Sequence, residues 1–349
     1  MNKSPLGIIA LLFLVAALYA PLKHDLVPLI KEAWFQMITK SLVQKNPPVP
    51  DEGTIWLGAT RPELPQSLYG IYELQQETQR QIQLVSFYQA WGDGPEHEFP
   101  YVALKNMHQG AFIPMITWEP WLSAFRLHQG KEPKNPLRII AQGSVDSYIR
   151  KWARGAVTHG KPIFVRIAHE PTNPQYPWAP QYDNTVADYQ KFWEHVVQIF
   201  RDEGALNVRF IWTPFGLEDH SYYPGNQWVD WIGLDLFNYG GLSIQGTWLD
   251  FYSLAKLYID AYKTLAKPIM AAEVASSSSG GNKSDWYRDL LRNICRGELP
   301  ELKAIVLFDI ASGNTASGLP VDWSLAEFPG TASHFSTQTC SILKRYNHE

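Results

Sequence analysis

The stretch Lys161-Pro-Ile-Phe-Val-Arg-Ile-Ala-His-Glu170 is an apolar run, typical of a buried strand, that ends in a glutamate. A second stretch of the same form, Lys267-Pro-Ile-Met-Ala-Ala-Glu273, follows about a hundred residues later. Ionised carboxylates resist desolvation, so a glutamate at the tip of a buried strand is costly unless the protein uses it. The pattern therefore predicts that Glu170 and Glu273 form a catalytic pair.

Around these two stretches, from residue 53 onward, strand-like runs alternate with helix-like stretches. Strands are expected at residues 54–58, 83–88, 111–117, 162–168, 207–212, 229–235, 268–273 and 302–308, and helices at 145–157, 186–203, 248–265 and 284–296. Apolar strands separated by helices indicate a parallel sheet covered on both faces, and eight such units over about 290 residues match a (β/α)8 TIM barrel. An open doubly wound sheet is the alternative, but Gly58-Ala-Thr-Arg-Pro-Glu63 lacks a glycine-rich phosphate fingerprint. Ser284 is expected to cap the last helix.

Composition fits one large globular domain with a short extra segment, since the 349 residues are 45% hydrophobic and 18% charged with a net charge of −4. No long basic run is present, so nucleic acid is not an expected partner. No Cys/His cluster has metal-ligand spacing, so neither a metal nor another cofactor is expected. Cys295 and Cys340 are the two cysteines, and the sequence leaves open whether they form a disulfide bond or remain free thiols. We expect a monomer.

The N-terminal residues 1–22 include an uncharged apolar run after Lys3 that is long enough to cross a membrane. A signal anchor and a cleaved signal peptide both fit this pattern. Residues 23–51 are expected to form an amphipathic helix and a proline-rich linker, and residues 52–349 the barrel domain. The domain is thus predicted to be tethered to the membrane and face the periplasm or extracellular space, or to be secreted.

In a (β/α)8 barrel, chemistry is placed at the C-terminal ends of the strands, where Glu170 would follow strand four and Glu273 strand seven. Two carboxyl groups between aromatic walls are what cleavage of a glycosidic bond requires, and their separation decides whether the enzyme retains or inverts configuration. The 14 Trp, 17 Tyr and 16 Phe provide ample material for such walls. A β-linked polysaccharide is therefore the expected partner.

Four segments in order resemble glycoside hydrolase family 26, the family of β-mannanases and mixed-linkage β-glucanases. They are Phe112-Ile-Pro-Met-Ile-Thr-Trp-Glu-Pro-Trp121, Arg166-Ile-Ala-His-Glu170 with Tyr176-Pro-Trp178, Tyr223-Pro-Gly-Asn-Gln-Trp-Val-Asp-Trp-Ile-Gly-Leu-Asp235 and Lys267-Pro-Ile-Met-Ala-Ala-Glu273. The resemblance runs from about residue 53 to residue 325. It implies a retaining enzyme in which Glu170 is the acid/base and Glu273 the nucleophile.

Glu170 must begin protonated, whereas Glu273 must stay ionised with the help of donors such as Arg166 or a tyrosine hydroxyl. His169 is expected to orient Glu170 or to bond the sugar, and Asp235 to be structural. The full set of expected substrate-binding residues is His169, Trp91, Trp118, Glu119, Trp121, Arg166, Tyr176, Trp178, Trp212, Phe237, Tyr239 and Trp323.

Two positions depart from the pattern of the family that the chain resembles. The His-Glu pair is usually followed by Met-Asn-Gly, where this chain has Pro171-Thr-Asn173. The sixth strand usually carries a tyrosine that bonds the nucleophile, where this chain has Phe237, and Tyr239 is the expected substitute. Three functions stay open: hydrolysis of a β-1,4-mannan or a mixed-linkage β-glucan, transfer to another sugar, and a barrel that binds polysaccharide beside a synthesis or export system without cleaving it. The sequence does not distinguish mannan, glucan and xylan.

Overall fold

The structure, a computed structural model, describes residues 49–243, 246–315, 318–325 and 340–345. The chain divides into two units, Met1–Lys45 and Asn46–Glu349, and all described residues belong to the second. The predicted apolar segment 1–22 and nearly all of the predicted segment 23–51 lie outside the described residues. Within the described part, no helix has the length and apolar character needed to span a bilayer.

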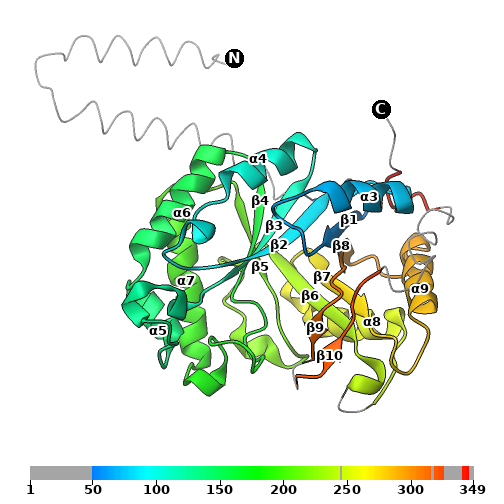
Figure 1. The fold of residues 1–349 in the computed structure, drawn as a ribbon. Coiled ribbons are helices and arrows are strands. Elements are labelled where there is room, and N and C mark those ends of the chain that lie inside the picture. Colours follow the sequence, from blue (N-terminus) through cyan, green and yellow to red (C-terminus); the bar gives the residue numbers. More distant parts are fainter. Residues whose placement is uncertain (1–48, 244–245, 316–317, 326–339, 346–349) are drawn as a thin grey trace, which may run out of the picture. The chain divides into compact units, whose positions relative to one another are not determined.

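The predicted barrel is confirmed, because eight parallel strands follow one another in order and the first pairs with the last (Figure 1). The strands are β1 Trp56–Thr60, β2 Leu84–Ala90, β3 Ile113–Glu119, β4 Ile163–Ile167, β5 Val208–Trp212, β6 Trp231–Asn238, β7 Ile269–Ser276 and β8 Leu302–Phe308. β6 and β7 run past their predicted ends at residues 235 and 273. Glu273 therefore lies within its strand rather than at the tip, whereas Glu170 comes after the end of β4.

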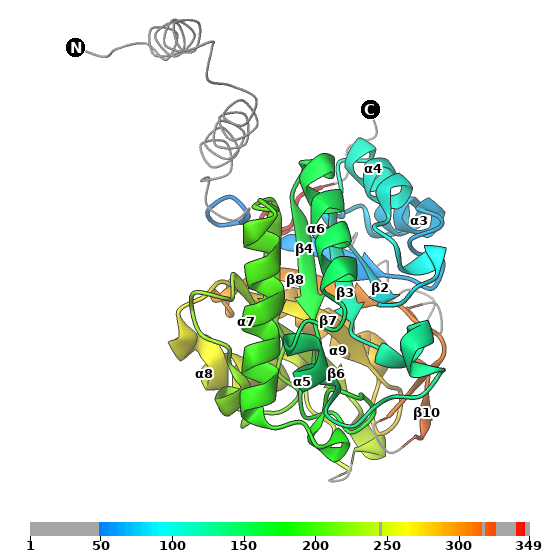
Figure 2. The ribbon, with the colours of Figure 1, turned by 90° about the vertical axis from the view of Figure 1, so that its left-hand side faces the viewer.

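Helices surround the barrel, and α6 and α7 lie side by side on its outside (Figure 2). The helices are α3 Tyr69–Thr78, α4 Tyr101–Gln109, α5 Pro136–Ala141, α6 Asp146–His159, α7 Val186–Asp202, α8 Phe251–Tyr262 and α9 Lys283–Cys295. Short 3₁₀ turns occupy Pro95–His97, Leu122–Ala124, Arg126–His128, Pro180–Tyr182, Asp219–Tyr222, Gly240–Leu242 and Lys263–Leu265, and β9 Gly313–Asn314 pairs with β10 Pro320–Val321.

The four predicted helices correspond to α6, α7, α8 and α9, with one correction at the start of α9. Asn282, not Ser284, is the N-cap, and its side-chain oxygen accepts a hydrogen bond from the backbone nitrogen of Asp285 at 3.0 Å. The helix begins one residue earlier than predicted, at Lys283, which moves the cap position back onto Asn282. Asparagine caps helices as well as serine does.

Alternate strand residues fill the interior of the barrel with apolar side chains. The interior cluster consists of Trp56, Leu84, Met115, Phe164, Ile211, Trp231, Met270, Ala272, Ala304 and Val306. Trp56 and Trp231 stack with ring centroids 6.3 Å apart. Gly58 makes room for this packing, since a Cβ atom there would lie 2.7 Å from Cβ of Leu84. The barrel is thus closed by a packed core, and polar groups must lie toward the strand ends.

Cys295, the last residue of α9, forms a disulfide bond with Cys340, which answers the question that the sequence left open. The C-terminal segment is also held by Arg80, whose Nη1 donates to the backbone oxygens of Cys340 at 3.2 Å and Leu343 at 3.3 Å. The described part of the C-terminus is therefore held to the rest of the domain by a disulfide bond and by hydrogen bonds, which include those from the backbone nitrogens of Ile55 and Gln81.

Candidate active site

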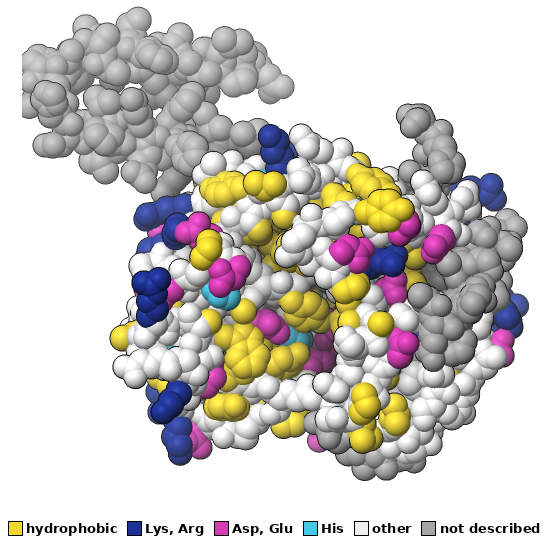
Figure 3. Space-filling model, in the orientation of Figure 1, with side chains coloured by type: hydrophobic (Ala, Val, Ile, Leu, Met, Phe, Trp, Pro, Cys, Tyr) yellow, Lys and Arg dark blue, Asp and Glu magenta, His cyan; other side chains and the backbone are white. Residues whose placement is uncertain are grey.

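A polar layer lies directly above the apolar interior of the barrel. Thr117, Arg166 and Asp235 each follow an interior position, Met115, Phe164 and Gly233, by two residues, so their side chains lie on the same face of their strands. In the space-filling view, acidic, histidine and hydrophobic side chains gather in a hollow near the centre of the face (Figure 3). This hollow is the candidate active site.

Glu273 reaches this layer because β7 carries an irregularity. Asp235 of β6 pairs with Glu273, whereas the preceding Leu234 pairs with Ala271, so β7 has one extra residue at this point. Ala272 belongs to the interior cluster, and without the extra residue the next side chain would point outward. A bulge of this kind re-aims a side chain. It places the Glu273 carboxylate beside Asp235 in the polar layer.

Arg166 is fully buried and donates hydrogen bonds to several polar side chains around it. Its Nη1 donates to Oδ1 of Asp235 at 2.6 Å and its Nε to Oγ1 of Thr117 at 3.0 Å, while Nη2 donates to Oε1 of Glu273. Burial opposes the charge of Arg166, but the carboxylates of Asp235 and Glu273 raise its pKa well above the ordinary value. The expectation that Arg166 holds Glu273 is confirmed, and Asp235 has the structural role expected of it.

Glu170 is placed by a strained loop. Ala168 has a φ of 40° and Glu170 a φ of 52°, a backbone region that residues with a Cβ atom seldom adopt. The backbone nitrogen of Glu170 donates to the oxygen of Thr213 at 2.9 Å, which ties the turn to the end of β5. Such strain persists where surrounding contacts enforce it, and it is concentrated at functional sites.

Burial and, next, the negative charge of Glu273 raise the pKa of Glu170 to about 7, against the hydrogen bond from Asn173 and the charge of Arg166. Burial also raises the pKa of Glu119 to about 7. By contrast, burial and the nearby Arg166 charge lower the pKa of His169 well below its usual value, so its imidazole is neutral. The site therefore contains a carboxylic acid poised near neutral pH beside a carboxylate held by donors.

One wall of the site is aromatic and comes from the loops after β3 and β4. Tyr176 stacks on Trp178 with centroids 4.4 Å apart, and the ring of Trp121 meets that of Trp178 edge-on at 5.7 Å. Nε2 of His169 lies 2.9 Å from the Tyr176 hydroxyl, and Nε1 of Trp121 donates to Oε2 of Glu119 at 3.2 Å. Trp178 is only 1% exposed, so it supports Tyr176 and Trp121, which are partly exposed.

The opposite wall, the Trp323 cluster, consists of Phe237, Tyr239, Phe308 and Trp323. The Trp323 ring lies 5.0 Å from that of Phe237 and 5.1 Å from that of Tyr239. Trp323 is 3% exposed and Phe237 and Tyr239 are partly exposed. Trp323 thus lies buried behind Phe237 and Tyr239, which form the surface of this wall.

The prediction that Trp91, Trp118 and Trp212 contact substrate was wrong. Trp91, Trp118 and Trp212 are 0% exposed and belong to the core between the barrel and the helices. Trp118 packs 4.7 Å from Trp152 of α6. The physical reason is strand alternation: Thr117 and Ile211 face inward, so Trp118 and Trp212, which follow them, face the helices.

Sequence reasoning missed two residues that contact Glu170 and Glu273. The Tyr88 hydroxyl donates to Oε1 of Glu273, so the tyrosine hydroxyl that bonds Glu273 comes from β2 and not from Tyr239. Nδ2 of Asn173 donates to Oε2 of Glu170 at 2.6 Å. Tyr88 follows Leu84 of the interior cluster by four residues, so strand alternation was a signal that places it on the inner face.

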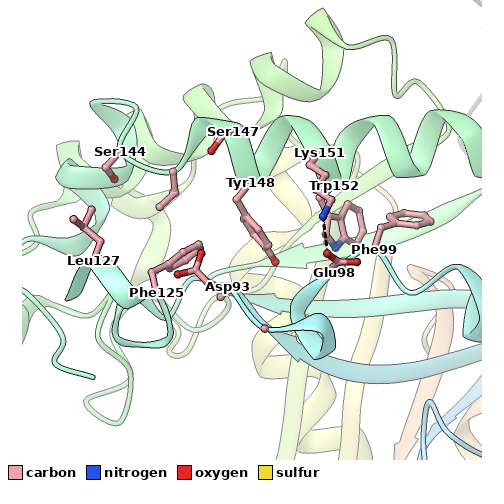
Figure 4. Close-up of a pocket in the computed structure, with 13 residues that line it drawn as sticks. Asp93, Glu98, Phe99, Phe125, Leu127, Ser144, Ser147, Tyr148, Lys151 and Trp152 are labelled. Carbon is pink, nitrogen blue, oxygen red and sulfur yellow. Dashed lines mark hydrogen bonds and ion pairs between the residues drawn. The ribbon is translucent and has the colours of Figure 1, made fainter. Parts of the chain in front are cut away.

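A separate pocket of about 370 Å³ lies between the loops after β2 and β3 and the first turns of α6 (Figure 4). Its polar groups bond mainly within the protein: the Tyr148 hydroxyl donates to the His97 oxygen at 2.9 Å, and Lys151 pairs with Glu98 at 2.6 Å. The pocket is therefore not assigned a ligand. Across the described ranges, no group of three or more His, Cys, Asp or Glu side chains is arranged to hold a metal ion.

Comparison with known proteins gives the same family for this arrangement. The family model for glycosyl hydrolase family 26 matches residues 106–277, a range that contains both Glu170 and Glu273. Endoglucanase H of Acetivibrio thermocellus is 31% identical over 251 residues, which cover 68% of this chain and 26% of that protein. Mannan endo-1,4-beta-mannosidase A and B of Caldalkalibacillus mannanilyticus is 29% identical over 136 residues, 37% of this chain and 24% of that protein. The chain thus spans about a quarter of the length of these curated relatives.

Solved structures share the fold at low sequence identity. The Bacillus subtilis mannanase BCman superposes with a TM-score of 0.59 at 18% identity, covering 86% of this chain and 91% of that one. The modular endo-beta-1,4-mannanase of Cellulomonas fimi gives a TM-score of 0.59 at 15% identity, covering 83% and 71%. The family model and the match to Endoglucanase H, together with the barrel, show that the chain belongs to glycosyl hydrolase family 26.

Proposed function

We propose that the barrel is a retaining endo-β-glycanase that hydrolyses a β-linked polysaccharide. The observation that carries the proposal is the unequal environment of its two glutamates. Glu273 receives hydrogen bonds from Tyr88 and Arg166, while burial raises the pKa of Glu170 to about 7. Glycosidases that retain configuration need this division between a nucleophile and an acid/base.

In the first step, a Glu273 carboxylate oxygen bonds to the anomeric carbon as the glycosidic bond breaks. The proton of Glu170 passes to the leaving sugar oxygen, so the glycosyl group is joined to Glu273 and Glu170 is left ionised. Burial opposes that charge on Glu170, whereas the Asn173 amide stabilises it. The transition state resembles an oxocarbenium ion.

In the second step, the Glu170 carboxylate takes a proton from water while the water oxygen bonds to the anomeric carbon. The bond to Glu273 breaks, which restores both carboxyl groups and releases a sugar of the original configuration. A pKa of about 7 suits both steps, because the same group must donate a proton and then accept one.

We further propose mixed-linkage β-glucan as the substrate ahead of β-1,4-mannan. The longer curated match, over 251 residues, is to a protein named endoglucanase, and the match to a mannosidase covers 136 residues. Partly exposed Trp121 and Tyr176 on one wall and Phe237 and Tyr239 on the other offer apolar faces on which sugar rings of either kind stack.

Export from the cytoplasm is a separate part of the proposal. The Cys295–Cys340 disulfide bond supports it, because such bonds persist mainly in oxidising compartments. The apolar sequence in residues 1–22 supports it as well. Fractionating cells that make the full chain, with membrane, secreted and cytoplasmic fractions probed separately, tests it, and recovery solely in the cytoplasm would contradict it.

The test of activity combines substrate and stereochemistry. The full chain is incubated with mixed-linkage β-glucan, β-1,4-mannan and β-1,3-xylan, and new reducing ends are measured together with the size of the products. Proton NMR of the first product distinguishes the anomers, and the β-anomer is expected. A first product of α-configuration would exclude the retaining mechanism, and binding of polymer with no new reducing ends would favour a non-cleaving barrel instead.

Two variants assign the roles of the glutamates on a β-glycoside with a nitrophenol leaving group. Azide added to Glu273→Ala is expected to yield the α-glycosyl azide, because azide replaces the nucleophile directly. Azide added to Glu170→Ala is expected to yield the β-azide, because it attacks the glycosyl-enzyme intermediate. Both variants should lose several orders of magnitude of kcat on polymer. Glu77→Ala, an exposed residue of α3, is the control.

A further inference from the structure

We propose that Tyr88 of β2 is the positioning residue of the nucleophile in this chain, a role that it takes in the absence of a hydroxyl at Phe237, and that Oε2 of Glu273 is the attacking oxygen. The proposal rests on the proposed function, since it concerns the group that attacks the sugar. It goes further by naming a residue outside the matched range 106–277 and by choosing between the two carboxylate oxygens.

Tyr88 reaches Glu273 across the mouth of the barrel. β2 and β7 are separated in the sheet by β1 and β8, so no backbone pairing brings the two residues together. The contact is made by the side chains: the Tyr88 hydroxyl donates to Oε1 of Glu273, and Nη2 of Arg166 lies 3.4 Å from the same hydroxyl. The hydroxyl is therefore part of one network with Arg166 and the nucleophile.

The Tyr88 ring is itself held in place on the side of the acid/base. It meets the His169 ring nearly at right angles with centroids 5.9 Å apart, and Cζ of Arg166 lies 5.9 Å from its centroid. Burial and the charge of Glu273 raise the pKa of Tyr88 well above its ordinary value, so the hydroxyl keeps its proton and acts as a donor. The ring is nevertheless 36% exposed, which places it in the open part of the site.

β6, by contrast, offers an aromatic ring without a hydroxyl. Phe237 follows Asp235, the partner of Glu273 in the sheet, by two residues and so lies on the same strand face. Its ring packs against Phe308 at 5.3 Å and Trp323 at 5.0 Å in the Trp323 cluster. The Phe237 position on β6 thus contributes apolar packing beside Glu273. The hydroxyl that donates to Glu273 comes instead from Tyr88 of β2, on the opposite side of the barrel.

Both donors to the nucleophile end on the same atom. Tyr88 and Arg166 donate to Oε1 of Glu273, and these are the donors to this carboxylate found among the described residues. Two hydrogen bonds to one oxygen fix the plane of the carboxylate and draw negative charge toward that oxygen. Oε2 is left to bond to the anomeric carbon as the glycosidic bond breaks and Glu170 gives its proton to the leaving oxygen.

The test compares Tyr88→Phe with the wild type on mixed-linkage β-glucan and on a β-oligoglucoside with a nitrophenol leaving group. Removing one preorganised donor is expected to lower kcat on the order of 10²-fold, with KM changed by less than about threefold. The loss should be similar for both substrates, because a defect in the nucleophile does not depend on protonation of the leaving group.

Two further variants keep the test decisive. Tyr101→Phe, an exposed tyrosine of α4, is the matched control for loss of a hydroxyl, and melting temperatures show that each variant folds. The fold-loss of kcat in Tyr239→Phe should be at least ten times smaller than the fold-loss in Tyr88→Phe. The inference is overturned if Tyr88→Phe keeps kcat within threefold of the wild type, or if Tyr239→Phe loses more kcat than Tyr88→Phe. Failure of the wild type to cleave any β-glycan would instead overturn the proposed function.

Discussion

Asn173 donates a hydrogen bond of 2.6 Å from Nδ2 to Oε2 of Glu170. Two further hydrogen bonds hold the loop that carries Asn173. The backbone nitrogen of Asn173 donates to the backbone oxygen of Glu170 at 3.0 Å, and the Thr172 hydroxyl donates to the carboxylate of Asp219 at 3.0 Å. The Pro171-Thr-Asn173 sequence therefore contributes a hydrogen-bond donor to Glu170, the proposed acid/base, rather than only reshaping a loop.

Replacing Asn173 with alanine should shift the pH dependence of activity. The amide stabilises the ionised form of Glu170 and so lowers its pKa, which lies at about 7 in the intact site. Without the amide the pKa rises, Glu170 stays protonated to higher pH, and the basic limb of kcat/KM moves upward. The measurement is the pH profile on β-glucan, with Asn106→Ala on exposed α4 as control. A basic limb that moved downward would contradict the assigned donor.

Parts of this site followed from the sequence because they depend on local pattern. Glu170 and Glu273 are found by the form of their strands, and Arg166 was expected as a donor to Glu273. Trp118 was misplaced because an error of one residue in a strand's facing exchanges core and cleft, and Tyr88 was not selected as a site residue. The extra residue in β7 that turns Glu273 inward has no signal in composition or periodicity, since it arises from pairing with β6.

His108 of α4 should make the fold sensitive to acid. Its pKa is lowered to about 4, chiefly by burial and then by His159, whose ring stacks on it at 4.9 Å, and by Lys161. The folded state thus disfavours the protonated form, whereas the unfolded chain binds a proton near pH 6.5. The contribution of neutral His108 to the free energy of unfolding is therefore fully present above pH 6.5 and is lost as the pH falls toward 4.

The check is the melting temperature measured from pH 7 to pH 4. His108→Gln removes the titrating ring, so the decline between pH 6.5 and pH 4 should be shallower than in the wild type. Replacing His159 as well should flatten it more, because burial and Lys161 also lower the pKa of His159. Parallel curves for the variants and the wild type would refute the role of this stacked pair.

The Cys295–Cys340 disulfide bond should stabilise the fold by restricting the unfolded chain. It closes a loop with a sequence separation of 45 residues, for which the chain-entropy model gives about 4 kcal/mol. Adding a thiol reductant should lower the melting temperature of the wild type. The Cys295→Ser/Cys340→Ser double variant should start from that lower value and be indifferent to the reductant. A reductant effect of equal size on both proteins would show that another process is being measured.

Trp118 and Trp121 stand three residues apart and should separate stability from binding. Trp118 is 0% exposed and packs on Trp152 and Tyr148, so truncation to alanine leaves a cavity that costs about 3–5 kcal/mol of unfolding free energy. Trp121 is partly exposed beside Tyr176 in the aromatic wall, and its truncation removes a surface on which a sugar ring stacks. Trp121→Ala should therefore raise KM for polysaccharide while its unfolding free energy falls less than that of Trp118→Ala.

Denaturant unfolding and steady-state kinetics, both measured on Trp118→Ala and on Trp121→Ala, test this prediction. If Trp118→Ala folded with wild-type stability, its burial against α6 would be wrong, and Trp118 would return to the set of cleft residues. If Trp121→Ala lost stability but kept the wild-type KM, the wall formed with Tyr176 would be part of the core and not a platform for substrate. The pair thus tests strand facing, because Thr117 faces Arg166 on the inner side of the barrel, whereas Trp118, one residue later, faces the helices.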